Sequence, residues 1–157
     1  MSFLQELYRL RIPFDDIKFA TNNFSDQNCI GQGGFGPVYK GQLPSSTRLT
    51  EHVAVKRLDL KGGQGEREFL MEIVMLASYK HDKLVSLVGF SNDGNEKVLV
   101  YKHEANGSLN NHLPSTNLSW EQRLRICVGV ARGLEYLHDG VGAGHRVLHR
   151  DVKIMCV

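Results

Sequence analysis

The sequence has few cysteines, no excess of charge of one sign and no long apolar run. Its three cysteines, Cys29, Cys127 and Cys156, are widely spaced and form no CxxC or Cys/His pattern. A disulfide framework and a zinc site are therefore not indicated. Lysine and arginine number 19 against 17 aspartate and glutamate, a formal net charge of +2. Since no basic block stands out, nucleic acid is not an expected partner.

The N-terminal stretch also lacks the pattern of a leader or a membrane span. Glu6, Arg9 and Arg11 interrupt its apolar residues, and no run approaches the roughly 18 residues that a span needs. Hydrophobic residues make up 41% of the chain and charged residues 23%, a balance typical of a folded domain. We therefore expect a soluble, unsecreted globular chain.

In the first half of the chain, strand patterns follow a short helical one. Ile17, Ala20 and Phe24 fall at helical spacing in a lead-in segment that Asn22 and Asn23 are placed to end. The residues that follow are β-branched and punctuated by glycine, which favours strands. The expected strands are residues 28–31, 37–43 and 52–58.

One helix and a hairpin come next. Phe69, Ile73 and Leu76 have the spacing of a helix of roughly four turns. Two apolar runs, residues 84–90 and 97–101, flank Asp93-Gly94, a strong tight-turn signal. Five strands and one helix result.

From residue 106 onward the pattern is helical. NGSLNNHL predicts a short helix, and Ser119 with Gln122 matches a capping box at the start of a long one. Gly140 is placed to end that helix in a left-handed cap, and a short strand is expected at 146–148. The apolar stripe of the long helix consists of Trp120, Leu124, Cys127, Ala131, Leu134 and Leu137.

A glycine-rich loop lies between the first two expected strands. Residues 30–38, IGQGGFGPV, contain GxGxxGxV, in which missing side chains let backbone N–H groups approach phosphate oxygens. A glycine-rich hairpin turn with no function is the simpler alternative. A dinucleotide-binding oxidoreductase is disfavoured, because its loop leads into a helix, whereas VYKG follows here.

The third expected strand carries VAVK, residues 53–56. Alternation places Ala54 and Lys56 on one face, Ala54 against a flat ligand and Lys56 toward phosphate oxygens. A surface lysine is the common alternative. A buried lysine needs a counter-charge, and Glu72 in the following helix is the candidate, with Glu66 and Glu68 as rivals nearer the exposed helix start.

Two further stretches complete an ordered series. The strand ending at Tyr101 leads into residues 102–105, where a chain would cross to a helical domain and where adenine could pair with the backbone. In His149-Arg150-Asp151-Val152-Lys153, Asp151 could orient or deprotonate a substrate hydroxyl and Lys153 could stabilise a phosphoryl group. A solvated charge cluster is the alternative when this stretch is taken alone.

Together, these stretches resemble the plant receptor-like serine/threonine protein kinases, over about residues 13–153. The resemblance is carried by ATNNFS, IGQGGFGPVYKGQL, VAVKRL, GEREFLMEI, VLVY with NGSL, RLRICVGVARGLEYLH and VLHRDVK, and it is closest to the malectin-like receptor kinases. It implies an α+β fold, namely a kinase N-lobe of five antiparallel strands and one helix followed by the first helices of an incomplete helical C-lobe. The implied domains are a juxtamembrane-like lead-in at 1–27, the N-lobe at 28–101, a hinge at 102–105 and the start of the C-lobe at 106–157.

The resemblance also implies ATP as cofactor and assigns roles to residues. Tyr101 matches the residue at the back of the adenine pocket. The family more often has Glu-Tyr or Glu-Phe where this chain has Lys102-His103. The implied ATP contacts are Ile30, Gly31, Gly33, Gly34, Gly36, Val38, Ala54, Lys56, Tyr101, Lys102 and Glu104. The implied catalytic residues are Lys56, Glu72, Asp151 as base and Lys153.

The sequence departs from the family pattern at its end. Cys156 stands where the family has a magnesium-binding asparagine, and no DFG motif occurs in the 157 residues. We therefore expect a C-terminally truncated kinase with no metal ligands of its own, with negligible activity and with an exposed apolar stripe on its long helix. The alternative is a non-catalytic module that binds ATP or docks on a kinase. The implied partners are ATP and a protein substrate or partner kinase. The implied location is cytoplasmic, since family members are usually plasma-membrane receptors with a cytosolic kinase domain.

Overall fold

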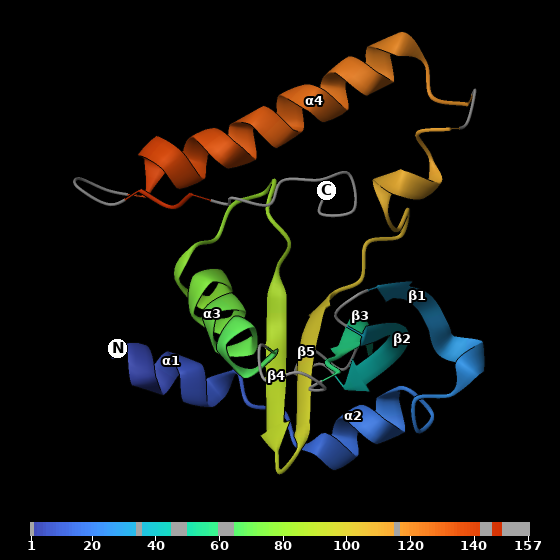
Figure 1. Cartoon of the computed structure of the whole chain (residues 1–157), viewed down its shortest axis with the longest axis vertical. Coiled ribbons are helices and arrows are strands. Elements are labelled where there is room, and N and C mark those ends of the chain that lie inside the picture. The colour runs from blue at the N-terminus through green and yellow to red at the C-terminus, as the bar shows by residue number, and fades with distance from the viewer. Residues whose placement is uncertain are drawn as a thin grey trace. The chain divides into compact units, whose positions relative to one another are not determined.

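The computed structural model of the chain (Figure 1) describes residues 2–33, 36–44, 50–59, 65–114, 117–141 and 146–148. The chain divides into two compact units. The first takes in Met1–Ser78 and Ser86–His103, and the second takes in Tyr79–Val85 and Glu104–Val157. None of the helices in the described ranges is long and apolar enough to cross a membrane.

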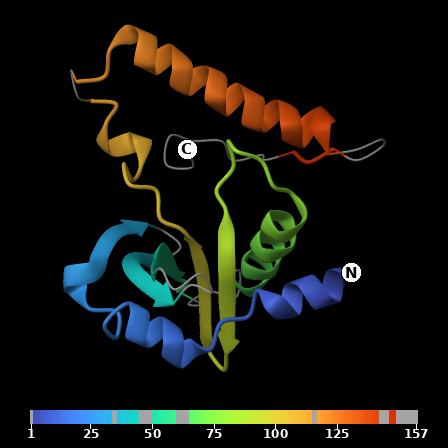
Figure 2. The same cartoon turned by 180° about the vertical axis from the view of Figure 1, so that it is seen from behind.

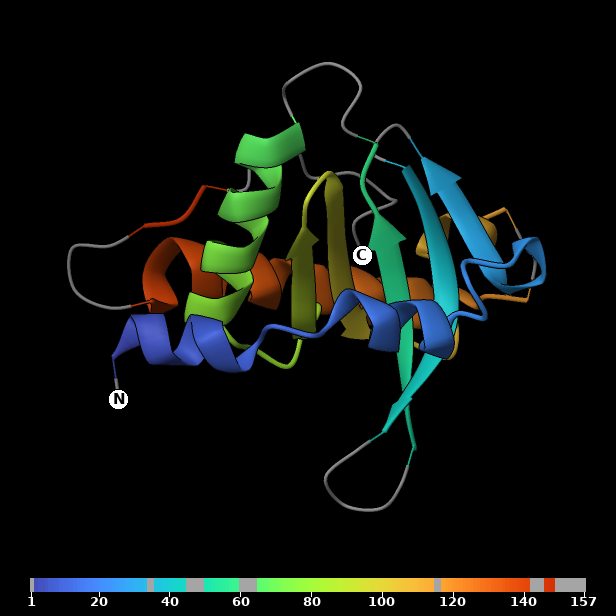
Figure 3. The ribbon, with the colours of Figure 1, turned by 90° about the horizontal axis from the view of Figure 1, so that it is seen from below.

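An antiparallel sheet forms the centre of the first unit. Its strands are β1 (Cys29–Gly33), β2 (Gly36–Pro44), β3 (Thr50–Arg57), β4 (Leu87–Asp93) and β5 (Glu96–Lys102). They lie in the order β1-β2-β3-β5-β4, which Figure 3 shows from below. The hairpin β4–β5 therefore places β5 beside β3 and leaves β4 at the edge. The predicted five-stranded sheet and its accompanying helix are confirmed.

That helix is α3 (Gly65–Ser78), which follows β3 in the chain. It buries Phe69, Ile73 and Ala77, four residues apart and hence on one side of the helix. The expected stripe through Phe69, Ile73 and Leu76 is confirmed, with Leu76 half-buried at its border. The helix thereby has a fixed rotation relative to the sheet.

The two faces of the sheet have separate cores because side chains alternate along each strand. Val53 and Val55 of β3 point into the first core, and Ala54 between them packs against the second. The first core consists of Ile17, Phe24, Tyr39, Leu43, Val53, Val55, Val98 and Val100. The second core, on the side of α3, consists of Leu58, Phe69, Ile73, Leu99 and Tyr101.

The lead-in is part of the folded unit. It forms α1 (Phe3–Arg9), α2 (Phe14–Ala20) and the short η1 (Asp26–Asn28). As expected, α2 stops before Asn22-Asn23, and both asparagines have positive φ angles. In Figure 3, α2 lies across the strands and α1 lies beside α3. The helix α1 was not predicted, although Ser2 and Gln5 form a capping box at its start.

Thr21 fixes the end of α2. It is fully buried, and its hydroxyl donates to the carbonyl of Ile17 at 2.8 Å while accepting from the N–H of Phe24 at 3.1 Å. Gly41 of β2 lets α2 approach, because a Cβ there would lie 3.1 Å from the carbonyl oxygen of Ala20. Ile17 and Phe24 are thus held in the first core.

The predicted hairpin at 84–101 needs two corrections. Its first strand begins at Leu87 rather than at residue 84, and Asp93 is the last residue of that strand. The connecting turn is Gly94-Asn95, where Gly94 has a φ of +55°. The strong turn signal was therefore placed one residue early, because Asp93 pairs with Glu96 across the hairpin.

The second unit confirms the helices and corrects their ends. The short helix η2 spans Leu109–Asn111, and α4 (Trp120–Glu135) starts with the predicted capping box of Ser119 and Gln122. The left-handed cap at Gly140 is wrong, because the chain continues as one π-helical turn, η3 (Tyr136–Gly140). The strand at 146–148 is also wrong: there Val147 instead donates its N–H to the carbonyl of Leu137 at 2.8 Å.

The apolar stripe of α4 is largely exposed in the described part of the chain, as expected. Trp120 is 73% exposed and Leu124 47%, and Cys127 is also at the surface. Leu137 of η3 is buried.

Candidate functional site

An ion pair joins β3 to α3 in the first unit. The Nζ of Lys56 lies 3.2 Å from Oε2 of Glu72. The two side chains are 21% and 33% exposed, so water screens the pair only in part. Alternation along β3 turns Lys56 toward the face with α3, and one turn of α3 separates Glu72 from the buried Phe69. The structure therefore pairs Lys56 with its predicted partner rather than with Glu66 or Glu68.

Tyr101 of β5 holds the other oxygen of the same carboxylate. Its hydroxyl donates a hydrogen bond to Oε1 of Glu72. Burial, and then the neighbouring Glu72 carboxylate, raise the pKa of Tyr101 above its ordinary value, so the hydroxyl keeps its proton and remains a donor. Sequence reasoning missed this bond. Strand alternation supplied a signal, since Leu99 and Tyr101 are two residues apart and both face the second core.

The strand register places four predicted residues on one face of the sheet. Val38 is paired with Lys56 across β2 and β3, and Ala54 is paired with Tyr101 across β3 and β5. Directly paired residues have side chains on the same side of a sheet. Val38, Ala54 and Tyr101 therefore share the face that carries Lys56.

The glycine-rich segment forms a hairpin between β1 and β2. Gly31 is paired with Val38, and Gly33 with Gly36. Because a strand and no helix follows Gly36, the dinucleotide-binding alternative is wrong for this loop. Ile30 lies in β1 and is 45% exposed. The predicted Gly34 lies outside the described residues.

Two glycines of this hairpin, Gly36 and Gly31, differ in how closely other atoms approach them. Gly36 has a φ of +112°, and a Cβ there would lie 2.1 Å from the carbonyl oxygen of Arg57. The fold itself therefore demands glycine at this position. At Gly31, by contrast, a Cβ would meet no atom within 4 Å. Sterics in the described part of the chain therefore leave room for a side chain at Gly31, where the ladder between β1 and β2 is irregular between Cys29 and Gly31.

Some backbone groups of the residues that follow Tyr101 already form hydrogen bonds within the chain. The N–H of Lys102 donates to Ser86 at 2.9 Å, and the N–H of His103 donates to His52 at 3.0 Å. An adenine base that pairs with the backbone of Lys102 would therefore have to use the carbonyl group of Lys102. The carbonyl of Glu104, in the second unit, accepts from the N–H of Gly107 at 2.9 Å.

The predicted base Asp151 and its neighbour Lys153 lie outside the described residues, and so does Cys156. In the ranges that the structure does describe, no group of three or more His, Cys, Asp and Glu side chains is arranged to hold a metal ion. The described part of the candidate site therefore consists of the sheet, α3 and the glycine hairpin.

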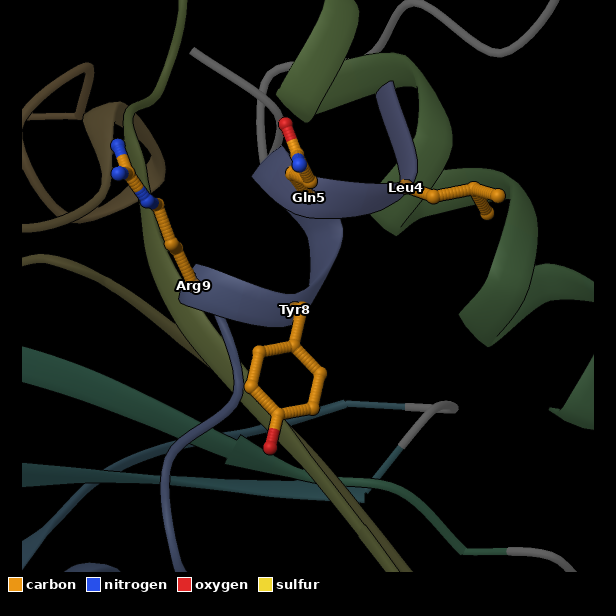
Figure 4. A pocket seen from close by; sticks show the side chains of 4 residues that line it. All are labelled: Leu4, Gln5, Tyr8 and Arg9. Carbon is orange, nitrogen blue, oxygen red and sulfur yellow. The ribbon is translucent and has the colours of Figure 1, made fainter. Parts of the chain in front are cut away.

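Two surface hollows lie elsewhere and hold none of the predicted residues. One is lined by Leu4, Gln5, Tyr8 and Arg9 of α1. Figure 4 shows that these four side chains spread in different directions instead of converging on one point. The other, in the second unit, is lined by His81, Arg132, Glu135, Tyr136, Asp139 and Gly140. There the rings of His81 and Tyr136 stack with centroids 4.8 Å apart.

Relatives of the chain are receptor-like protein kinases of Arabidopsis thaliana. Receptor-like protein kinase HERK 1 is 49% identical over 146 residues, which are 91% of this chain and 17% of the relative. Receptor-like protein kinase THESEUS 1 is 48% identical over 143 residues, 89% of this chain and 16% of the relative. Cysteine-rich receptor-like protein kinase 41 is 44% identical over 154 residues, 96% of this chain and 22% of the relative. The chain thus spans less than a quarter of the length of each of these relatives.

A family model places these similarities in a wider group. The model described as protein tyrosine and serine/threonine kinase matches residues 24–155. The matched range includes the glycine hairpin, the Lys56–Glu72 ion pair and the HRD stretch at 149–151. The chain belongs to the protein tyrosine and serine/threonine kinase family.

Proposed function

We propose that the first unit binds ATP as the nucleotide site of a protein kinase. The observation that carries this proposal is the Lys56–Glu72 ion pair on the sheet face shared with Val38 and Ala54. The Tyr101 hydroxyl donates to one oxygen of the Glu72 carboxylate, and the other oxygen accepts from the ammonium of Lys56 and holds it in place. A cation held in place before the ligand arrives contributes to affinity because its ordering does not have to occur on binding.

The proposed contacts divide by chemistry. Backbone N–H groups of the glycine hairpin cover the phosphates, and Val38 and Ala54 pack against adenine. Lys56 neutralises phosphate charge, and the backbone of the proposed hinge at 102–105 pairs with the base. The proposed contact residues are Ile30, Gly31, Gly33, Gly34, Gly36, Val38, Ala54, Lys56, Tyr101, Lys102 and Glu104. The proposed hinge divides an N-lobe at 28–101 from a C-lobe that starts at 106.

For the reaction, we propose phosphoryl transfer from ATP to a serine or threonine hydroxyl of a protein. In this proposal Asp151 accepts the hydroxyl proton, Lys153 stabilises the transferred phosphoryl group, and ADP leaves as the bond to its terminal phosphate breaks. Bound magnesium supplies charge neutralisation in this chemistry. The cysteine at position 156, where kinases of this type have a magnesium-binding asparagine, supports a second proposal, that the 157 residues by themselves bind ATP with negligible transfer. Similarity to receptor-like kinases also supports the prediction of a cytoplasmic location.

Titration of the chain with a fluorescent ATP analogue tests nucleotide binding. Replacing Lys56 with methionine removes a charged contact, and we expect affinity to fall by at least about 10-fold, since hydrogen bonds to charged groups contribute about 1.5–3 kcal/mol. The matched control is Lys18→Met. Lys18 also forms an ion pair, with Asp15 at 2.5 Å, but it lies on α2, outside the proposed site. Equal affinity in the Lys56→Met variant and the unchanged chain would contradict the proposal.

A further inference from the structure

Residues 10–12 of the lead-in pair with β4 along the edge that does not contact β5. The N–H of Ile12 donates to the carbonyl of Phe90, and the N–H of Phe90 donates to the carbonyl of Leu10, each at 2.8 Å. Arg11 and Phe90 form a parallel bridge. Figures 1 and 2 show the lead-in passing along the sheet at β4 between α1 and α2. The lead-in is therefore fixed to the sheet by backbone bonds and not only by α2.

Gly89 makes this contact possible. A Cβ at Gly89 would lie 2.5 Å from the carbonyl oxygen of Leu10 and 2.6 Å from Cδ1 of Ile12. The ladder between β4 and β5 is irregular between Leu87 and Gly89, which sets Phe90 in register with Leu99. Any side chain at position 89 must therefore displace either the lead-in or the strand.

The same contact reaches α3 through side chains. The rings of Phe90 and Phe69 meet edge to face with centroids 6.1 Å apart. Leu7 of α1 is half-buried and packs against the second core, to which Phe69 and Ile73 of α3 belong. These two residues flank Glu72 on α3. The lead-in therefore supports the part of the helix that presents the carboxylate to Lys56.

We infer that residues 7–12 position Glu72, so that nucleotide affinity at Lys56 depends on the lead-in being docked. Ile12 packs against the first core and Leu7 against the second, so the segment is anchored on both faces of the sheet. Displacing it frees Phe90 and loosens the packing of Phe69 against the sheet. The inference deepens the proposed function and rests on it for the nucleotide readout.

Replacement of Leu7 by serine tests the inference. The matched control is Leu4→Ser in the same helix, because Leu4 is 76% exposed. In the nucleotide-free chain we expect hydrogen exchange of the α3 amides near Glu72 to quicken by about 10-fold in Leu7→Ser and to stay unchanged in Leu4→Ser. Affinity for the fluorescent ATP analogue should fall by about 5- to 10-fold in Leu7→Ser only.

A double-mutant comparison separates positioning from general loss of stability. If Leu7 acts through Glu72, adding Leu7→Ser to a Glu72→Gln chain should change analogue affinity by less than about 2-fold, since the two changes remove the same interaction. An equal loss in both backgrounds would show that Leu7 acts by some other route, and the inference would be wrong.

If Leu7→Ser fails to fold, a second variant, Gly89→Ala, tests the same inference. Gly89→Ala should displace residues 10–12 and give the same faster exchange in α3. Its control is Gly129→Ala, where the nearest atom to the new Cβ is Cδ of Lys83 at 3.7 Å, an ordinary contact. Unchanged α3 exchange in Gly89→Ala would overturn the inference. If the unchanged chain binds no ATP analogue, the proposed function fails, while the exchange measurements still decide whether the lead-in supports α3.

Discussion

Tyr101 and Glu72, 29 positions apart in the chain, are joined by a hydrogen bond from the phenol to Oε1 of the carboxylate. The bond connects β5 to α3 across the second core. Tyr101 donates to Oε1 and Lys56 donates to Oε2, so the two donors do not compete for one oxygen of Glu72. Glu72 is thereby held from two strands at once.

Replacing Tyr101 with phenylalanine should lower the free energy of unfolding by about 1.5–3 kcal/mol, the usual contribution of a hydrogen bond to a charged group. The ring stays in the core and only the hydroxyl is lost. Urea unfolding measures the change. Tyr8→Phe is the control, because Tyr8 is 76% exposed, and its midpoint should not move. A Tyr101→Phe chain as stable as the unchanged one would show that the bond contributes nothing.

The glycine hairpin allows structure and function to be separated. Gly36→Ala should destabilise the chain by about 2–3 kcal/mol or more, because a left-handed φ and a backbone oxygen oppose the new methyl group. Gly31→Ala should leave stability nearly unchanged, since its Cβ meets no atom within 4 Å, and yet should weaken binding of the ATP analogue. Thermal unfolding and titration measure the two effects. If the Gly31→Ala chain binds the ATP analogue as tightly as the unchanged chain, the proposed phosphate contact at Gly31 is wrong.

Thr21 should be sensitive to loss of its hydroxyl alone. Thr21→Val keeps the volume and leaves the N–H of Phe24 without its buried acceptor, which should cost about 1–3 kcal/mol. Urea unfolding is again the measurement. Thr50→Val, at an exposed position of β3, provides the control. A loss no larger at Thr21 than at Thr50 would contradict the role given to this side chain.

The Arg57–Glu96 pair should make stability depend on pH in a narrow acidic range. Nε and Nη2 of Arg57 each donate to one oxygen of Glu96, at 2.8 and 2.5 Å. The hydrogen bond from Arg57 lowers the pKa of Glu96, so the folded state holds the proton less tightly than the unfolded state. The stabilisation is present above the unfolded pKa of about 4.3 and is lost as the pH falls through the folded value.

The size of this effect is limited by solvent. The two side chains are 38% and 32% exposed, and pairs of this kind contribute less than about 1 kcal/mol. The difference in urea midpoint between the unchanged chain and Glu96→Gln should be largest near neutral pH and should vanish once the pH has fallen below the lowered pKa of Glu96 in the folded state. Glu121→Gln, which breaks an exposed pair with Arg125, is the control, and at neutral pH it should change the midpoint less than Glu96→Gln does. A Glu96→Gln difference independent of pH would exclude this carboxylate as its source.

The sequence was sufficient for the parts of the site that depend on periodicity. Alternation in residues 53–56 placed Lys56 and Ala54 on one face, and helical spacing placed Glu72 next to the buried side of α3. Both patterns are local, and the hydrophobic effect enforces them wherever one face is buried. The glycine hairpin was predicted for the same reason, because β-branched residues follow Gly36.

The features that were missed depend on contacts distant in sequence or on the balance between similar backbone states. No pattern near Tyr101 specifies that α3 brings a carboxylate to its hydroxyl. The segment 10–12 has no strand alternation, and its pairing with Phe90 needs a glycine about 80 positions later. At Gly140 the chain forms a π-helical turn, and such turns are rare enough that a glycine near a helix end favours the left-handed cap instead.

The bridge between Arg11 and Phe90 also bears on how the edge of the sheet is covered. An open edge strand offers unpaired N–H and C=O groups to the edge of any other sheet, and such edges are common starting points for intermolecular β-pairing. Leu10 and Ile12 occupy these groups at Phe90. A shortened form that begins at β1 would leave this edge uncovered, and we expect it to aggregate even if every nucleotide contact were retained.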